Sequence, residues 1–213
     1  MIRTVVFDVG ETLVDETRSW GGWADHMGVP RLTFFAALGV VLERGWHHRR
    51  VFELVRPGFD YAAAVAAREA AGWRYGFEPT DFYPDALPCL GELKRAGFRI
   101  GLAGNQPEAA ESALAALNLP VDFIASSAGW GVEKPDPAFF RRVSETAGCP
   151  PDQIAYVGDR IDNDIAPAAE AGMAAVFLRR GPWALAQSTD PRAARAALQI
   201  ETLEGLAALI AAL

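Results

Sequence analysis

The segment TVVFDVGETL, residues 4–13, begins with a pattern that predicts the class of fold. A short, uninterrupted apolar run from Thr4 to Phe7 ends at Asp8. Continuous runs of β-branched and aromatic residues are typical of a strand that is buried on both faces, as in a parallel sheet. We therefore expect a parallel sheet with Asp8 at the carboxyl end of its first strand.

Four similar apolar runs follow along the chain, at residues 98–103, 123–125, 154–157 and 174–178. Between them lie helical patterns at residues 85–96, 107–117, 137–147 and 164–171, and a last apolar stripe at 203–213 predicts a C-terminal helix packed on the sheet. Strands that alternate with helices of this length predict an α/β fold with a doubly wound sheet.

Residues 16–83 interrupt the alternation. They contain no convincing strand, and they show helical patches at residues 32–44 and 61–71, punctuated by Pro30, Pro57 and Pro79. We interpret them as an inserted helical subdomain, with residues 1–15 and 84–213 forming the core domain.

Composition excludes several classes of protein. The 213 residues carry a net charge of −7, which argues against nucleic acid as a partner. No apolar stretch is long enough to span a bilayer, so no membrane role is expected. Two widely separated cysteines, Cys89 and Cys149, form neither a disulfide framework nor a zinc motif, which favours a reducing, cytoplasmic location. The sequence does not indicate an oligomeric state.

Polar residues follow the predicted strands where ligands of an open parallel sheet bind. An aspartate at a strand end is able to attack phosphorus, and further carboxylates with a main-chain carbonyl suit Mg²⁺. A lysine would add positive charge where transferring oxygens become negative. The candidates are Asp8, Gly10 and Thr12 after the first strand, Gly104 and Asn105 after the second, then Lys134, Asp159 and Asp164.

These residues lie in four segments that resemble, in order along the chain, the motifs of the haloacid dehalogenase-like hydrolase superfamily. They are FDVGETL (7–13), LAGN (102–105), the lysine of VEKPDP (132–137) and VGDRIDND (157–164). The inserted stretch occupies the place of that superfamily's first-position (C1) cap. The resemblance implies a Rossmann-like core, a mobile helical lid and Mg²⁺-dependent hydrolysis of a small phosphorylated metabolite through an aspartyl-phosphate.

The same resemblance implies a role for each candidate. Asp8 is the expected nucleophile, and Lys134 is expected to act with it in catalysis. Metal ligands are expected at Asp8, the Gly10 carbonyl, Asp159 and Asp164. The phosphoryl group is expected to be held by Thr12, Gly104, Asn105 and Lys134.

Two positions depart from the family pattern. Gly10 stands where the superfamily usually has a second aspartate that acts as general acid and base, and Gly104 replaces a usual Ser or Thr. Loss of proton transfer costs about 10²–10⁴ in rate. We therefore expect a slow enzyme or a substitute acid, for which Glu11 is the nearest candidate, although some superfamily phosphatases also resemble this chain in having glycine at the position of Gly10.

Two other functions remain open from the sequence. A metal-free 2-haloacid dehalogenase would also lack the second aspartate, but it would not need the acidic motif around Asp159 and Asp164. A slow or inactive homologue that only binds a phosphate ligand would be consistent with Gly10 and Gly104. Metal dependence separates the dehalogenase from the phosphatase.

Overall fold

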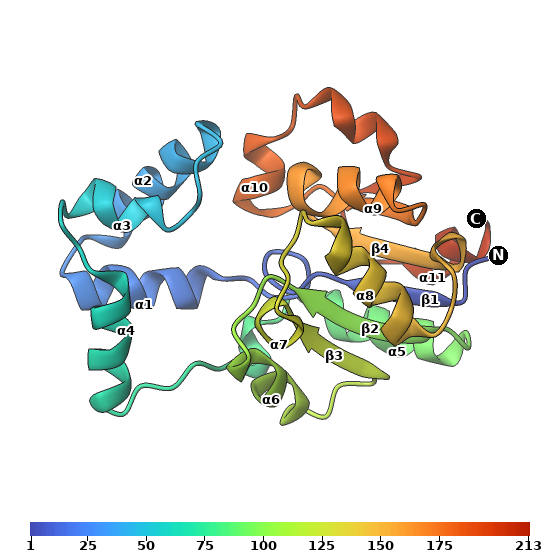
Figure 1. Cartoon of the computed structure of the whole chain (residues 1–213), viewed down its shortest axis with the longest axis horizontal. Helices are drawn as coiled ribbons and strands as arrows, with labels where there is room; N and C mark the ends of the chain where they lie inside the picture. The colour runs from blue at the N-terminus through green and yellow to red at the C-terminus, as the bar shows by residue number, and fades with distance from the viewer. The chain divides into compact units, whose positions relative to one another are not determined.

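The computed structural model describes residues 1–213 and divides into two compact units, Met1–Asp15 with Phe77–Leu213 and Glu16–Gly76. The larger unit contains one six-stranded, fully parallel sheet in the order β3-β2-β1-β4-β5-β6. Figure 1 shows the neighbouring strands β3, β2, β1 and β4 of this sheet. This confirms the predicted α/β class and doubly wound sheet. The strands are β1 (Thr4–Phe7), β2 (Arg99–Gly104), β3 (Phe123–Ser126), β4 (Ile154–Gly158), β5 (Ala174–Leu178) and β6 (Leu198–Ile200).

The central strand β1 explains why its sequence is a continuous apolar run. Val5 and Phe7 pack into one hydrophobic cluster, Val6 packs into another, and all three side chains are fully buried. A strand covered on both faces places apolar residues at every position instead of alternating them with polar ones.

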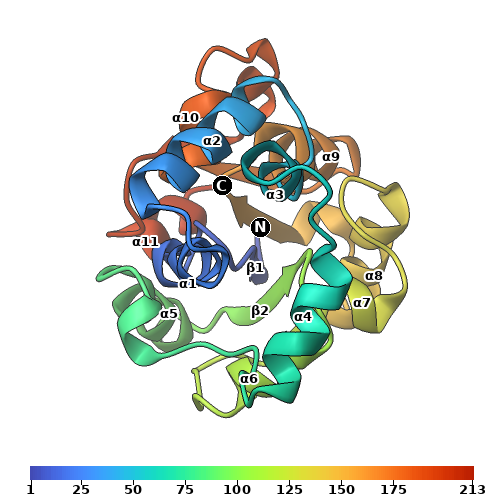
Figure 2. The ribbon, with the colours of Figure 1, turned by 90° about the vertical axis from the view of Figure 1, so that its left-hand side faces the viewer.

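Helices cover both faces of this sheet. Residues of α5 and α11 belong to the cluster that contains Phe7, and residues of α8 and α9 belong to the cluster that contains Val6. Figure 2 shows α5 and α11 on one side of the strands and α8 and α9 on the other. The short elements α7, α10 and β6 were not predicted. None of the helices has the length and apolar character that crossing a membrane requires. The helices of this unit are α5 (Ala86–Arg95), α6 (Ala109–Ala115), α7 (Ser127–Trp130), α8 (Pro137–Ala147), α9 (Ala166–Glu170), α10 (Gly181–Ala186) and α11 (Leu206–Ala211).

The smaller unit is helical and is built around aromatic side chains. The rings of Trp23 and Phe52 lie 5.1 Å apart, and Tyr61 packs 5.0 Å from Trp23. The sequence predicted the second and fourth helices but missed the first and third. The helices are α1 (Thr17–Met27), α2 (Arg31–Glu43), α3 (Arg50–Val55) and α4 (Tyr61–Ala70).

The chain leaves and re-enters the larger unit at adjacent points. The Asp15 amide donates to the carbonyl of Asp81 (2.8 Å), and the Tyr83 amide donates to the carbonyl of Leu13 (3.0 Å). Phe82, which is 8% exposed, packs into the core of the larger unit. Residues 77–83, placed in the insertion by the sequence analysis, are therefore part of the larger unit in the structure.

Candidate active site

The sheet order brings the motif residues to one edge. Strand β1 lies between β2 and β4, with Phe7 in register with Leu102 and Val157. Asp8 follows β1 directly, and its amide donates to the carbonyl of Val157 (2.9 Å). Asp159 follows β4 in the same way, so the two carboxylates come from neighbouring strand ends.

Three carboxylates converge at this edge. Asp8, Asp159 and Asp164 each offer a carboxylate oxygen, and these oxygens lie within 4.8 Å of one another. Asp159 and Asp164 are almost completely buried, whereas the Asp8 side chain keeps 11% exposure. Asp8 is thus the carboxylate of the three that is open to an incoming molecule.

A single buried lysine joins two of these acids. The Nζ atom of Lys134 lies 2.7 Å from Asp8 Oδ1 and 2.6 Å from Asp164 Oδ1. Its backbone is fixed by Asn105, whose Nδ2 donates to the Lys134 carbonyl (2.9 Å) while Oδ1 accepts from the Lys134 amide (2.8 Å). Asn105 therefore holds the lysine loop against the end of β2.

Burial and crowding shift the protonation of these groups. Burial lowers the pKa of Lys134, but the negative charges of Asp164 and Asp8 outweigh it and hold that pKa well above its ordinary value. Burial raises the pKa of Asp164 to about 6 against the opposing effect of Lys134. Burial, followed by the charges of Asp164 and Asp8, raises the pKa of Asp159 well above its usual range. One lysine does not neutralise three clustered acids.

Asp159 has an unused ligand atom. Its Oδ2 is buried without a hydrogen-bond partner, and its Oδ1 receives only a long contact from the Thr12 hydroxyl (3.4 Å). A buried, unpaired carboxylate oxygen is costly unless something compensates it. An oxygen-only donor set of three carboxylates is the kind that Mg²⁺ prefers, so the residues present fit that ion.

Two glycines allow the acids to lie where they do. A Cβ atom on Gly104 would lie 2.5 Å from Asp8 Oδ1, and a Cβ on Gly158 would lie 2.4 Å from Asp164 Oδ2. Side chains at either position would displace a site carboxylate. Gly104 therefore gives Asp8 space in place of a hydroxyl donor.

The other residues predicted in the loop after β1 lie beside the three carboxylates and make fewer contacts with them. Thr12 is fully buried beside Asp159, so its hydroxyl contacts that carboxylate. Gly10 pairs with Val14 in the tight loop that follows β1, and its carbonyl stays a predicted ligand. Glu11 directs its carboxylate to the Tyr83 hydroxyl (2.7 Å).

Sequence reasoning missed two supports of the site. The Arg160 amide donates to Asp164 Oδ2 (3.0 Å), and the Gln187 side chain accepts from the Ile161 amide (2.6 Å) where the π-helical turn Ile161–Ile165 begins. The Gln187 contact joins residues 26 positions apart. A contact of this kind leaves no local pattern in the sequence.

Comparison with known proteins places this geometry in a family context. Residues 2–172 match the family described as haloacid dehalogenase-like hydrolase. The chain is 34% identical over 219 residues to a glyceraldehyde 3-phosphate phosphatase of Methanopyrus kandleri, a match that covers 90% of this chain and 89% of the relative.

Solved structures share the fold. A haloacid dehalogenase-superfamily hydrolase of Geobacter sulfurreducens superposes with a TM-score of 0.70 at 20% identity, covering 98% of this chain and 96% of the other. An L-2-haloacid dehalogenase of Xanthobacter autotrophicus superposes with a TM-score of 0.66 at 21% identity, covering 99% of each chain. At such identities the similarity concerns the fold alone.

Proposed function

Because the chain belongs to the haloacid dehalogenase-like hydrolases, we propose that it is an Mg²⁺-dependent phosphatase of a small phosphorylated metabolite. The observation that carries the proposal is the buried, unpartnered Asp159 Oδ2 beside Asp8 and Asp164. A hydrolase that attacks carbon would not need a divalent cation, and so would not need three carboxylates to hold one. The 34% identity to a glyceraldehyde 3-phosphate phosphatase makes that ester the first substrate to test.

Asp8 is the proposed nucleophile, because its side chain is the most accessible of the three carboxylates. Its oxygen forms a bond to phosphorus as the bond from phosphorus to the ester oxygen breaks, and the leaving alkoxide takes a proton from solvent water. Water then attacks the aspartyl-phosphate, whose P–O bond to Asp8 breaks to release inorganic phosphate. Gly10 provides no acid for the first step, so protonation of the leaving group is expected to limit the rate.

The surrounding residues bind and orient. Asp8, Asp159, Asp164 and the Gly10 carbonyl are the proposed Mg²⁺ ligands. The ion would screen repulsion between Asp8 and an anionic substrate. Lys134 holds Asp8 by an ion pair and places positive charge beside the transferring oxygens. Asn105 keeps that lysine in position, and it retains a second amide hydrogen for the phosphoryl group.

Further assignments rest on the same proposal. We propose that Glu16–Gly76 is a helical cap that selects the leaving group. This unit is inserted between the first strand and the rest of the sheet. We assign to Thr12 the role of orienting Asp159, which its hydroxyl contacts. We assign to Gly104 the role of leaving space for the Asp8 carboxylate. No nucleic-acid partner is proposed for a chain with a net charge of −7.

The test is phosphate release from glyceraldehyde 3-phosphate and a panel of other small esters, with Mg²⁺ or with EDTA. Wild type is compared with Asp8→Asn and with Asp152→Asn, which removes an exposed carboxylate outside the site. Mg²⁺-dependent turnover that is lost only in Asp8→Asn supports the phosphatase. Halide release from 2-chloropropionate in EDTA would support the dehalogenase instead, a reading that Gly10 favours. Binding of Mg²⁺ and phosphate without any turnover would support an inactive homologue.

A further inference from the structure

Glu11 combines two features that are unusual for an acidic residue. Its side chain is 5% exposed, and its backbone has a φ of +53°. A left-handed conformation costs a residue with a side chain about 1–2 kcal/mol, so it persists only where surrounding contacts hold it. Glu11 lies three residues after Asp8, in the loop that also contains Gly10 and Thr12.

Tyr83 holds this loop by two hydrogen bonds. Its hydroxyl donates to Glu11 Oε2 (2.7 Å), and its amide donates to the carbonyl of Leu13 (3.0 Å). Burial, followed by the negative charge of Glu11, raises the pKa of Tyr83. The hydroxyl therefore stays protonated and remains a donor at all physiological pH values.

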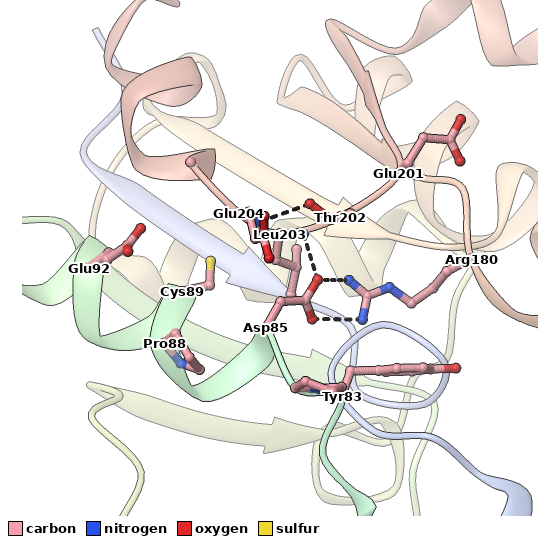
Figure 3. Close-up of a pocket in the computed structure, with 12 residues that line it drawn as sticks. Tyr83, Asp85, Pro88, Cys89, Glu92, Arg180, Glu201, Thr202, Leu203 and Glu204 are labelled. Carbon is pink, nitrogen blue, oxygen red and sulfur yellow. Dashed lines mark hydrogen bonds and ion pairs between the residues drawn. The ribbon is translucent and has the colours of Figure 1, made fainter.

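The Tyr83 ring is itself packed beneath a cation. The guanidinium of Arg180 lies 4.3 Å from the ring centroid, within the range of a cation–π interaction. Arg180 is fixed by a bidentate pair with Asp85 (2.6 and 2.9 Å), and Asp85 also accepts from the Leu203 amide (2.9 Å). Arg180, Asp85 and Tyr83 line a cavity of about 730 Å³. Figure 3 shows how these three side chains lie.

The turn after β5 packs against Glu11 from another direction. A Cβ atom on Gly181 would lie 2.6 Å from Glu11 Oε2 and 2.9 Å from Glu11 Cβ. Gly181 also has a φ of +75°, a conformation that side chains rarely adopt. Backbone at Gly181 and the hydroxyl of Tyr83 therefore confine the Glu11 carboxylate.

The confined loop leads directly to the site. Within it, the Glu11 amide donates to the Val14 carbonyl (2.7 Å), and the Leu13 amide donates to the Val9 carbonyl (2.9 Å). Its next residue, Thr12, presents its hydroxyl to Asp159. Because Gly10, Glu11 and Thr12 are consecutive in this hydrogen-bonded loop, a displaced Glu11 is expected to shift the Thr12 contact and the Gly10 carbonyl.

We infer that Glu11 is a positioning residue, and that its bond to Tyr83 fixes the loop after β1 in the form that binds the metal. The inference rests on the proposed function, because it concerns the affinity of that Mg²⁺ site. It also replaces the expectation that Glu11 is the substitute acid, since its carboxylate is directed to Tyr83 and packed against Gly181.

The experiment measures Mg²⁺ binding alone, by calorimetry without substrate, beside kcat and KM. Glu11→Ala and Tyr83→Phe are each expected to weaken Mg²⁺ binding about tenfold, equal to about 1.4 kcal/mol. Because both remove the same bond, the double variant is expected to be no weaker than the worse single variant. Glu11→Gln keeps an oxygen that accepts from Tyr83, so it is expected to stay within about threefold of wild type.

The control variant lies outside the Glu11–Tyr83 contact. Glu204→Ala removes an exposed carboxylate beside the Arg180 cavity and should leave Mg²⁺ binding unchanged. Unchanged binding in both Glu11→Ala and Tyr83→Phe would overturn the inference. Loss of turnover in Glu11→Gln, with normal Mg²⁺ binding and a missing limb in the pH profile, would identify an acid instead. Wild type that binds no Mg²⁺ would refute the proposed function, and the inference with it.

Discussion

The larger unit carries twelve basic and twenty-one acidic residues, a net charge of −9, whereas the smaller unit carries eight arginines against six acidic residues, a net charge of +2. The two units also pair their cations differently. Lys134 is buried between carboxylates at a point fixed by strand ends. Arg68 lies between two indole rings, 4.3 Å from both Trp23 and Trp73.

This difference separates a charge in the proposed active site, which is paired with buried acids, from a charge that supports the packing of aromatic rings. A lysine shared by two buried carboxylates has a large electrostatic effect, because removal of either partner leaves an uncompensated buried charge. An arginine stacked on aromatic rings contributes mainly through dispersion and the ring quadrupole, which is a smaller effect. Substitutions in the two units should therefore differ in size and in what they change.

The largest effect is expected from Lys134→Met in the absence of Mg²⁺. Removal of the lysine leaves Asp8 and Asp164 unpaired in the interior, so the free energy of unfolding should fall by about 3–5 kcal/mol. The matched control is Lys94→Met, which breaks a surface pair with Asp122 of the same 2.6 Å length and should cost about 1 kcal/mol or less. Urea unfolding measures both. An equal decrease in the free energy of unfolding in the two variants would contradict the expected difference between buried and exposed ion pairs.

Next in size is the loss of activity in Gly158→Ala. The added Cβ would lie 2.4 Å from Asp164 Oδ2, so the carboxylate would have to shift to relieve the clash. A misplacement of about 1 Å in an active-site group costs about 10² in rate. Gly39→Ala in the smaller unit is the control, since nothing lies within 4 Å of its added Cβ. It should leave kcat/KM unchanged and stabilise helix α2 by about 0.5–1 kcal/mol. A rate loss in Gly39→Ala would contradict the comparison.

A smaller effect is expected from pH. Because the folded-state pKa of Asp164 is raised to about 6, the folded protein binds its proton more tightly than the unfolded chain. Stability of the metal-free protein should thus increase as pH falls from 7 to 5, by about 1 kcal/mol from this group. The increase should be smaller in Asp164→Asn and in saturating Mg²⁺. Thermal unfolding at several pH values measures it, and the same pH dependence of stability in wild type and in Asp164→Asn would refute it.

The smallest effect is expected from Arg68→Met. It removes cation–π contacts with Trp23 and Trp73 and should reduce the free energy of unfolding by about 1 kcal/mol. Mg²⁺ affinity should not change, because Arg68 lies outside the acidic cluster. Arg49→Met, which removes a single contact with Tyr61 at 4.9 Å, is expected to cost about half as much. Weaker Mg²⁺ binding in Arg68→Met would contradict the expectation that this arginine affects packing alone.

The fold was more accessible to sequence analysis than the details of the site. Strands such as Thr4–Phe7 were predicted because burial on both faces leaves an uninterrupted apolar run. The edge strand Leu198–Ile200 was missed because it has three residues and an exposed Gln199 at its centre. Helix α1 was missed because Gly21 and Gly22 lower its helical propensity, although packing overrides this.

Within the site, the sequence located residues better than contacts. Asp8 and Asp159 were predicted to lie together because each follows a strand, and Asp164 because it begins the next helix; the structure brings their carboxylates within 4.8 Å of one another. The Tyr83–Glu11 bond joins residues 72 positions apart, and the need for glycine at 158 depends on where Asp164 turns back. Both depend on side-chain approach in three dimensions, which no local pattern encodes.

The hydrogen bond between Asp15 and Asp81, where the chain leaves and re-enters the larger unit, has an evolutionary consequence. The amide of Asp15 and the carbonyl of Asp81 already bring the two ends of the insertion together, and both lie in the larger unit. Exchanging the intervening segment for one of another length therefore changes only a slowly varying loop-closure entropy. The length and sequence of the insertion are therefore able to change while the sheet and its three carboxylates stay as they are.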